Sequence, residues 1–142
     1  MPSYQNILLP TDFSEASGRA AAKAKNLSGS EGATLSVVHV VDYVPPTYIA
    51  AELPANFSSK DSIVERARSH LEEWVAGHGL DGAKLIVAVG TPKKEIASVA
   101  REHGVDLIVI GSSGERGLHL LLGSTTSALI HNPPCDVLSV TG

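Results

Sequence analysis

The sequence predicts a single α/β domain, built as a doubly wound parallel sheet of five strands with helices on both faces. Three observations lead to this prediction. Short apolar runs alternate with longer segments of helical periodicity along the whole chain. The 142 residues suit one domain, which we place at 1–142. The hydrophobic content of 43% is sufficient for a core and argues against disorder.

The first strand is expected at Asn6–Pro10, a short apolar run that Thr11 and Asp12 follow. Ser14 then suits the N-cap of a helix that runs to about Leu27. One face of that helix consists mainly of alanine, whose small side chain permits close packing of the helix on the sheet. Its residues are Ala16, Ala20, Ala24 and Leu27.

The second strand is expected at Ala33–Val41, where valine is frequent. The segment Asp42–Ser59 carries three prolines and no periodicity, which indicates a long loop, and such loops are usually functional or mobile. Ser62 and Glu65 fit a capping box at the start of the next helix, which ends at Gly77.

The third strand is expected at Ala83–Val89. Thr91 and Pro92 mark the start of a helix with proline in its first position, and Gly104 ends it. The fourth strand follows at Val105–Ile110.

The last helix is expected at Ser124–His131, and two prolines separate it from a fifth strand at Asp136–Val140. In doubly wound sheets, ligands bind at the carboxyl ends of the strands, near the point where the strand order reverses. The loops after the first, second and fourth strands are therefore the places to look for a site.

A glycine-rich loop follows the fourth strand, with glycines at Gly111, Gly114 and Gly117, and it leads into Gly123-Ser124-Thr125. The spacing fits neither the P-loop nor the dinucleotide-binding fingerprint. Its position between a strand and a helix nevertheless predicts a phosphate site, because main-chain N–H groups and the helix dipole favour an anion there. Glycines of an ordinary turn are the alternative.

Asp12 and Val40 are further candidates, since each lies near the carboxyl end of a strand. The Asp12 carboxylate can accept hydrogen bonds from a ribose or an adenine amino group, or it can simply favour the start of a helix. Val40 can flank an adenine ring or belong to the core, and the sequence does not separate these alternatives. His39 is interpreted as a packed strand residue.

Composition excludes several classes of function. The net charge of −4 and the scattered basic residues argue against nucleic acid as a partner. Aromatic residues make up 4% of the chain, too few for a platform that stacks single-stranded bases. No segment is long and apolar enough to span a membrane, and the first residues do not resemble an export signal. With Cys135 as its single cysteine, the chain is expected in the cytoplasm.

The residues also give no indication of catalysis. Six histidines are spread without the spacing of metal ligands, so no metal site is predicted. No serine stands at a motif spacing from a histidine or aspartate, so no catalytic residue is assigned. Cys135 is interpreted as a small buried hydrophobic residue.

Separated segments of the chain, taken together and in order, resemble the universal stress protein family over essentially the whole length. They are Asn6–Ser14, Leu35–Asp42, Gly90–Pro92 with Ile96 after it, and Asp106–Gly111 through Pro134–Leu138. The resemblance implies the strand order 3-2-1-4-5. It also implies a homodimer that forms through the last strand, at Val137–Val140.

Some members of this family bind ATP through the motif G-x2-G-x9-G-[ST], whereas others lack the glycines. This chain has Gly111, Gly114, Gly123 and Ser124, with an interval of eight residues where the motif has nine. The resemblance implies ATP, with or without Mg²⁺, as the ligand. Carried over by position, it places Pro10, Thr11 and Asp12 near the base and ribose, Val40 on adenine, Ile110, Gly111 and Gly114 along the ribose and phosphates, and Gly123, Ser124 and Thr125 on the phosphates.

The leading hypothesis is an ATP-binding stress-response protein that acts as a nucleotide-dependent switch or as a module that binds a protein client not identified by the sequence. One alternative is a dimeric interaction protein of the same family that binds no nucleotide. Another is a very slow ATPase or phosphotransferase. A dinucleotide-dependent dehydrogenase is disfavoured, because the glycine loop follows the fourth strand and not the first.

Overall fold

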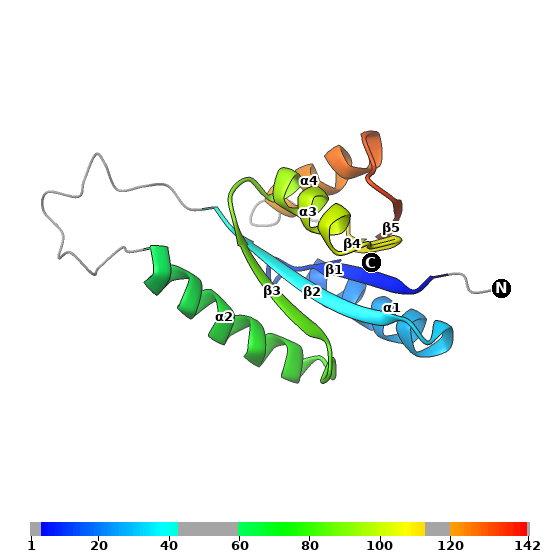
Figure 1. The fold of residues 1–142 in the computed structure, drawn as a ribbon, viewed down its shortest axis with the longest axis horizontal. Helices are drawn as coiled ribbons and strands as arrows, with labels where there is room; N and C mark the ends of the chain where they lie inside the picture. Colours follow the sequence, from blue (N-terminus) through cyan, green and yellow to red (C-terminus); the bar gives the residue numbers. More distant parts are fainter. Residues whose placement is uncertain (1–3, 43–59, 113–119, 142) are drawn as a thin grey trace, which may run out of the picture.

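A computed structural model describes residues 4–42, 60–112 and 120–141 of the protein. It shows one sheet of five parallel strands in the order β3-β2-β1-β4-β5 (Figure 1). This confirms both the doubly wound architecture and the strand order that the family resemblance implies. Gly114 and all of the predicted loop Asp42–Ser59 except Asp42 lie outside the described residues.

Strands and helices alternate strictly along the chain. Their bounds are β1 Asn6–Pro10, α1 Glu15–Glu31, β2 Thr34–Val41, α2 Lys60–Gly77, β3 Lys84–Val89, α3 Pro92–Glu102, β4 Leu107–Gly111, α4 Leu120–His131 and β5 Asp136–Val140. None of the helices described is long and apolar enough to cross a membrane.

The helices form two layers, with α1 and α2 on one face of the sheet and α3 and α4 on the other (Figure 1). The central strand β1 supplies side chains to both layers. Its Ile7 and Leu9 pack with α1 and α2, whereas Leu8 packs with Val38 and with Ile96 of α3. A strand covered on both faces is apolar throughout, which explains why this segment is a continuous apolar run.

Two predicted helix starts are confirmed at the level of single residues. Ser14 is the N-cap of α1, and its hydroxyl oxygen accepts a hydrogen bond from the Ser17 N–H at 3.2 Å. Thr91 precedes α3, and Pro92 occupies the first turn. Both helices begin at the carboxyl edge of the sheet, so their first turns face the region where a site is expected.

Three other helix bounds differ from the prediction. Helix α1 continues to Glu31, where Gly32 ends it with a φ of 67°. Helix α2 begins at Lys60, so Ser62 lies inside it and is not its N-cap. Helix α4 begins at Leu120, because the leucines before Gly123 are good helix formers. Gly123, Ser124 and Thr125 consequently lie within α4 and do not open it.

Candidate functional site

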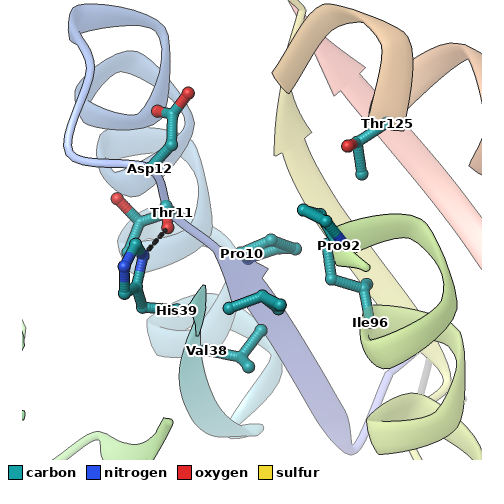
Figure 2. A pocket seen from close by; sticks show the side chains of 9 residues that line it. Pro10, Thr11, Asp12, Val38, His39, Pro92, Ile96 and Thr125 are labelled. Atoms are coloured by element: carbon teal, nitrogen blue, oxygen red, sulfur yellow. Dashed lines mark hydrogen bonds between the residues drawn. The ribbon is translucent and has the colours of Figure 1, made fainter. Parts of the chain in front are cut away.

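A pocket of about 70 Å³ opens at the carboxyl ends of β1 and β2, against the first turn of α3 and against α4 (Figure 2). Pockets for complete small molecules are usually several times larger, from roughly 300 Å³ upward. The described residues therefore enclose enough space for only a fragment of such a molecule. The lining residues are Pro10, Thr11, Asp12, Val38, His39, Val40, Pro92, Ile96 and Thr125.

Most of the pocket wall is apolar. Figure 2 shows Pro10 and Val38 on one side and Pro92 and Ile96 on the other, with Asp12 and Thr125 above them. Val38 and Ile96 are buried in the core that α3 and α4 form with the sheet, so their positions are fixed by packing. A slot with apolar walls and polar groups at one end suits a flat heterocycle that carries a polar substituent.

Asp12 is held by the turn between β1 and α1. Its Oδ1 accepts hydrogen bonds from the Ser14 N–H at 3.0 Å and from the Ser17 hydroxyl at 2.8 Å. The Asp12 N–H in turn donates to the Ser17 Oγ at 3.1 Å. These bonds realise the helix-start interpretation of Asp12. They also fix the position of the carboxylate at the pocket. Because both bonds end on Oδ1, they leave Oδ2 to face a ligand.

His39 lines the pocket and fixes the main chain beside it. Its Nδ1 donates a hydrogen bond to the Thr11 carbonyl at 2.9 Å, 28 positions away in sequence. Burial lowers the pKa of His39, and the charge of His70 lowers it further, whereas the Thr11 carbonyl and Asp12 act in the opposite direction. The prediction of a packed strand residue is confirmed, but the ring has this additional structural role.

Phe13 packs the other side of this turn against α2. Its ring lies 4.4 Å from the His39 ring and is stacked on His70 at 3.9 Å between centroids. Phe13 has a φ of 67°, the left-handed region that residues with a side chain rarely adopt. The turn between β1 and α1 is therefore held from both sides, by Ser17 inside and by the stacked rings outside.

The main-chain N–H and C=O of Val40 point to the space beyond the last residue of β1. The register pairs Pro10, the last residue of β1, with Val38, and the Thr11 N–H donates to the Val38 carbonyl at 2.9 Å. Main-chain groups alternate sides along a strand, so Val40 turns its N–H and C=O to the same side as Val38. On the opposite side, Val41 accepts a bond from the Gly90 N–H.

The carboxyl end of β4 is built differently. Ile110 is fully buried and packs in the core, and it does not line the pocket. A Cβ on Gly111 would lie 2.4 Å from the Ala16 carbonyl oxygen, so close packing of α1 requires a glycine here. The Gly111 carbonyl accepts a hydrogen bond from the Thr126 hydroxyl at 3.0 Å.

The structure thus brings together five of the residues that the sequence predicts, namely Pro10, Thr11, Asp12, Val40 and Thr125. Thr125 is 3% exposed, and Ser124 lies on the exposed side of α4. Gly123 also lies in α4, and Gly114 lies outside the described residues.

Four lining residues were not predicted as part of a site: Val38, His39, Pro92 and Ile96. Val38 and His39 directly precede Val40 in the second strand, which is a usable signal. Pro92 and Ile96 belong to the unit after β3, and only the neighbouring position of β3 and β2 in the sheet brings their helix to the pocket.

Cys135 is half-buried, and burial raises the pKa of its thiol, which is typical of a structural cysteine. Within the described part of the chain, no three His, Cys, Asp or Glu side chains come together in a group that could hold a metal ion.

Residues 3–141 match the model of the Universal stress protein family. The chain belongs to the universal stress protein family. Among curated proteins of the family, it is 36% identical to Universal stress protein A homolog 2 of Coxiella burnetii over 141 residues. That match covers 99% of this chain and 97% of the relative.

Solved structures show the same universal stress protein fold. The hypothetical protein MJ0577 superimposes with a TM-score of 0.75 at 30% identity, covering 98% of this chain and 96% of its own. A universal stress protein in complex with cAMP gives 0.64 at 24% identity, with 97% of each chain covered. A universal stress protein from Archaeoglobus fulgidus in complex with dAMP gives 0.61 at 21%, with 98% of each covered. The last two show the fold alone.

Proposed function

We propose that this universal stress protein binds an adenine nucleotide, with the base in the pocket between Val38 and Ile96, and that it acts as a nucleotide-dependent switch or partner-binding module in the stress response. The observation that carries the proposal is the apolar slot at the switch point of the sheet, bordered by the Asp12 carboxylate and the main chain of Val40. We place the protein in the cytoplasm, on the ground that its single cysteine suits a reducing compartment.

The main chain of Val40 would select adenine. An adenine edge offers a ring nitrogen that accepts a hydrogen bond beside an amino group that donates one. The Val40 N–H and C=O, both turned toward the end of β1, provide the complementary donor and acceptor. Guanine presents a carbonyl and a ring N–H in the reverse order, so its carbonyl would face the Val40 carbonyl. We therefore expect GTP to bind more weakly than ATP.

Asp12 would bind the ribose. Its Oδ1 is occupied by Ser14 and Ser17, which leaves Oδ2 to accept from a sugar hydroxyl. The phosphates would then point toward α4, where Thr125 borders the pocket and Ser124 and Gly123 precede it. Gly114 and the main chains of Ile110 and Gly111 remain predicted contacts of the ribose and phosphates.

ATP is the proposed nucleotide, and Mg²⁺ enters only as the ion that ATP carries on its phosphates. The structures that hold cAMP and dAMP support an adenine nucleotide in proteins of this fold. ATP turnover is expected to be negligible. Phosphoryl transfer requires charge stabilisation around the γ-phosphate, and the described residues that line the pocket include one carboxylate and no lysine or arginine.

Titration calorimetry with nucleotide-stripped protein tests the proposal. We expect ATP and AMP to bind and GTP to bind about tenfold more weakly, a difference of ~1.4 kcal/mol. Val40→Phe should fill the slot and weaken ATP binding at least about tenfold. Val41→Phe is the matched control, because Val41 is the next residue of the strand and does not line the pocket. Absence of heat and of thermal stabilisation at millimolar ATP would contradict the proposal.

A homodimer through Val137–Val140 is the second part of the proposal. Strand β5 lies at the edge of the sheet, and its Leu138 is 36% exposed. On the neighbouring helix α4, Ile130 is 50% exposed. An exposed apolar edge strand is a template for pairing with another chain, and a two-fold dimer would pair the same strand of two copies. Light scattering should therefore give the mass of a dimer for the wild type and of a monomer for Leu138→Lys. A monomeric wild type at high concentration would overturn this part.

A further inference from the structure

A second cavity, separate from the pocket, runs between α3 and α4. This groove has a volume of about 400 Å³ and is lined by Lys93, Lys94, Ala97, Arg101, Ala128, Leu129 and Asn132. The same two helices supply Pro92, Ile96 and Thr125 to the nucleotide pocket. The two cavities are therefore formed by the same two helices but are lined by different residues.

The basic residues of α3 lie along one stripe that faces the groove. Lys93, Ala97 and Arg101 recur every four residues, which places them in a row on one side of a helix, with Lys94 beside them. The acidic residues of α3, Glu95 and Glu102, fall on another side. The carboxylate of Glu95 lies against Gly90, 2.7 Å from where a Cβ of that glycine would be.

In the part of the chain that the structure describes, no carboxylate balances these three cations. The groove lining contains no acidic residue, and α4 has none along its whole length of Leu120–His131. Among the described residues, neither Lys93, Lys94 nor Arg101 forms an ion pair. In a chain with a net charge of −4, this local concentration of positive charge attracts an anionic partner.

The floor of the groove is apolar and its rim is polar. Ala97, Ala128 and Leu129 form the floor, and the exposed Asn132 offers an amide that can donate to or accept from a peptide main chain. Arg101 lies eight residues beyond Lys93, about 12 Å along the helix axis. That length accommodates two helical turns of a bound segment or about four residues of an extended one.

We propose that the groove between α3 and α4 docks an acidic peptide segment of a partner protein, with carboxylates on Lys93, Lys94 and Arg101 and an apolar side chain over Ala97 and Ala128. This builds on the partner-binding part of the proposed function and gives that part a location. The charge is confined to a groove with an apolar floor, which suits a peptide better than a flat membrane surface or a nucleic-acid backbone.

Fluorescence anisotropy tests the groove without any nucleotide, so that failure of the nucleotide proposal does not affect the result. The probe is a labelled twelve-residue peptide in which Glu–Glu pairs alternate with Leu–Leu pairs, measured in 50 mM salt. We expect saturable binding to the wild type, weakened about fivefold in Lys93→Glu and again in Arg101→Glu, and lost at 0.5 M salt. The same peptide with glutamine for glutamate should not bind.

Lys23→Glu is the control, because Lys23 is exposed on α1, on the other face of the sheet. It should bind the peptide nearly as well as the wild type, and thermal unfolding checks that all variants fold. Absence of peptide binding, or equal binding in Lys93→Glu, would overturn the proposal. So would tighter binding of phosphatidylserine vesicles or of duplex DNA that the same two charge reversals abolish.

Discussion

The carboxyl ends of β1 and β4 are neighbours in the sheet, and the sequence predicts that both contribute to one site, but the structure uses them differently. After β1, Thr11 and Asp12 border an open pocket. At the end of β4, Ile110 and Gly111 are buried. The cause is α1, whose first turn places the Ala16 main chain directly over Gly111 and leaves Asp12 beside it uncovered.

The comparison teaches that a glycine at a strand end has two possible explanations. A ligand that approaches closely needs the absence of a side chain, and so does a helix that packs closely. At Gly111 the space that a Cβ would take is already filled by Ala16, so packing alone is sufficient to require glycine. Substitutions at three positions, ordered by the size of the expected effect, test how far the two strand ends differ.

The largest effect is expected at Gly111. Gly111→Ala puts a Cβ 2.4 Å from the Ala16 carbonyl oxygen and 2.6 Å from its carbon, and main-chain atoms cannot move aside cheaply. Urea unfolding should show a loss of about 3 kcal/mol, toward the upper end for overpacked cores. Gly29→Ala is the matched control. A Cβ added at Gly29 would have no atom within 4 Å, and alanine favours a helix more than glycine does. That variant should therefore be as stable as the wild type or slightly more stable. Equal stability of Gly111→Ala would refute the packing explanation.

A pair of substitutions at Asp12 separates its structural role from ligand binding. Asp12→Asn keeps an oxygen that can accept from Ser14 and Ser17 but removes the charge. Asp12→Ala removes both and should lose about 1 kcal/mol of stability, as expected for a lost helix-start interaction. We expect calorimetry to show ATP binding weakened about tenfold in Asp12→Ala, the value of one hydrogen bond to a charged group. Unchanged ATP affinity in both variants would confine Asp12 to the turn.

The smallest effect is a pH dependence at His39. Burial lowers its pKa in the folded state below the value of about 6.5 in the unfolded chain. The unfolded state then binds more protons, so this residue makes stability fall as the pH drops from 7 through 6.5 and below. His39→Asn should reduce the fall in melting temperature between pH 7.5 and pH 5.5. The exposed His103 serves as control through His103→Asn. An unchanged fall in the His39 variant would be inconsistent with this account.

Much of the fold was predictable because each strand is a short apolar run with a clear end. The bounds of β1 and β5 agree with the prediction, and so do the N-cap at Ser14 and the helix start at Thr91 and Pro92. The starts of α2 and α4 were wrong, because Ser59 and Ser62 are equally good capping residue types for α2 and no capping residue directly precedes Leu120. Local signals place a helix end only where a capping residue is present.

Apart from Thr125 on α4, which the family resemblance supplied, the predicted residues that line the pocket lie at or just after the ends of β1 and β2. Asp12 and Val40 lie near strand ends, and that position made them candidates, although their roles stayed open in the sequence. Pro92 and Ile96 come from a helix about 80 residues after β1, and the hydrogen bond between His39 and Thr11 joins β2 to the residue after β1. These contacts depend on the order of strands in the sheet, which periodicity does not contain.

The most direct test of the central claim is a nuclear magnetic resonance titration of ¹⁵N-labelled protein with ATP. The account predicts that the amide signals of Asp12, Val40 and Thr125 shift together and saturate at one nucleotide per chain. The amide signal of Gly82, which lies just before the amino end of β3, should not shift. Shifts that avoid the pocket, or no shifts at millimolar ATP, would contradict the assignment of an adenine site between β1, β2 and α3.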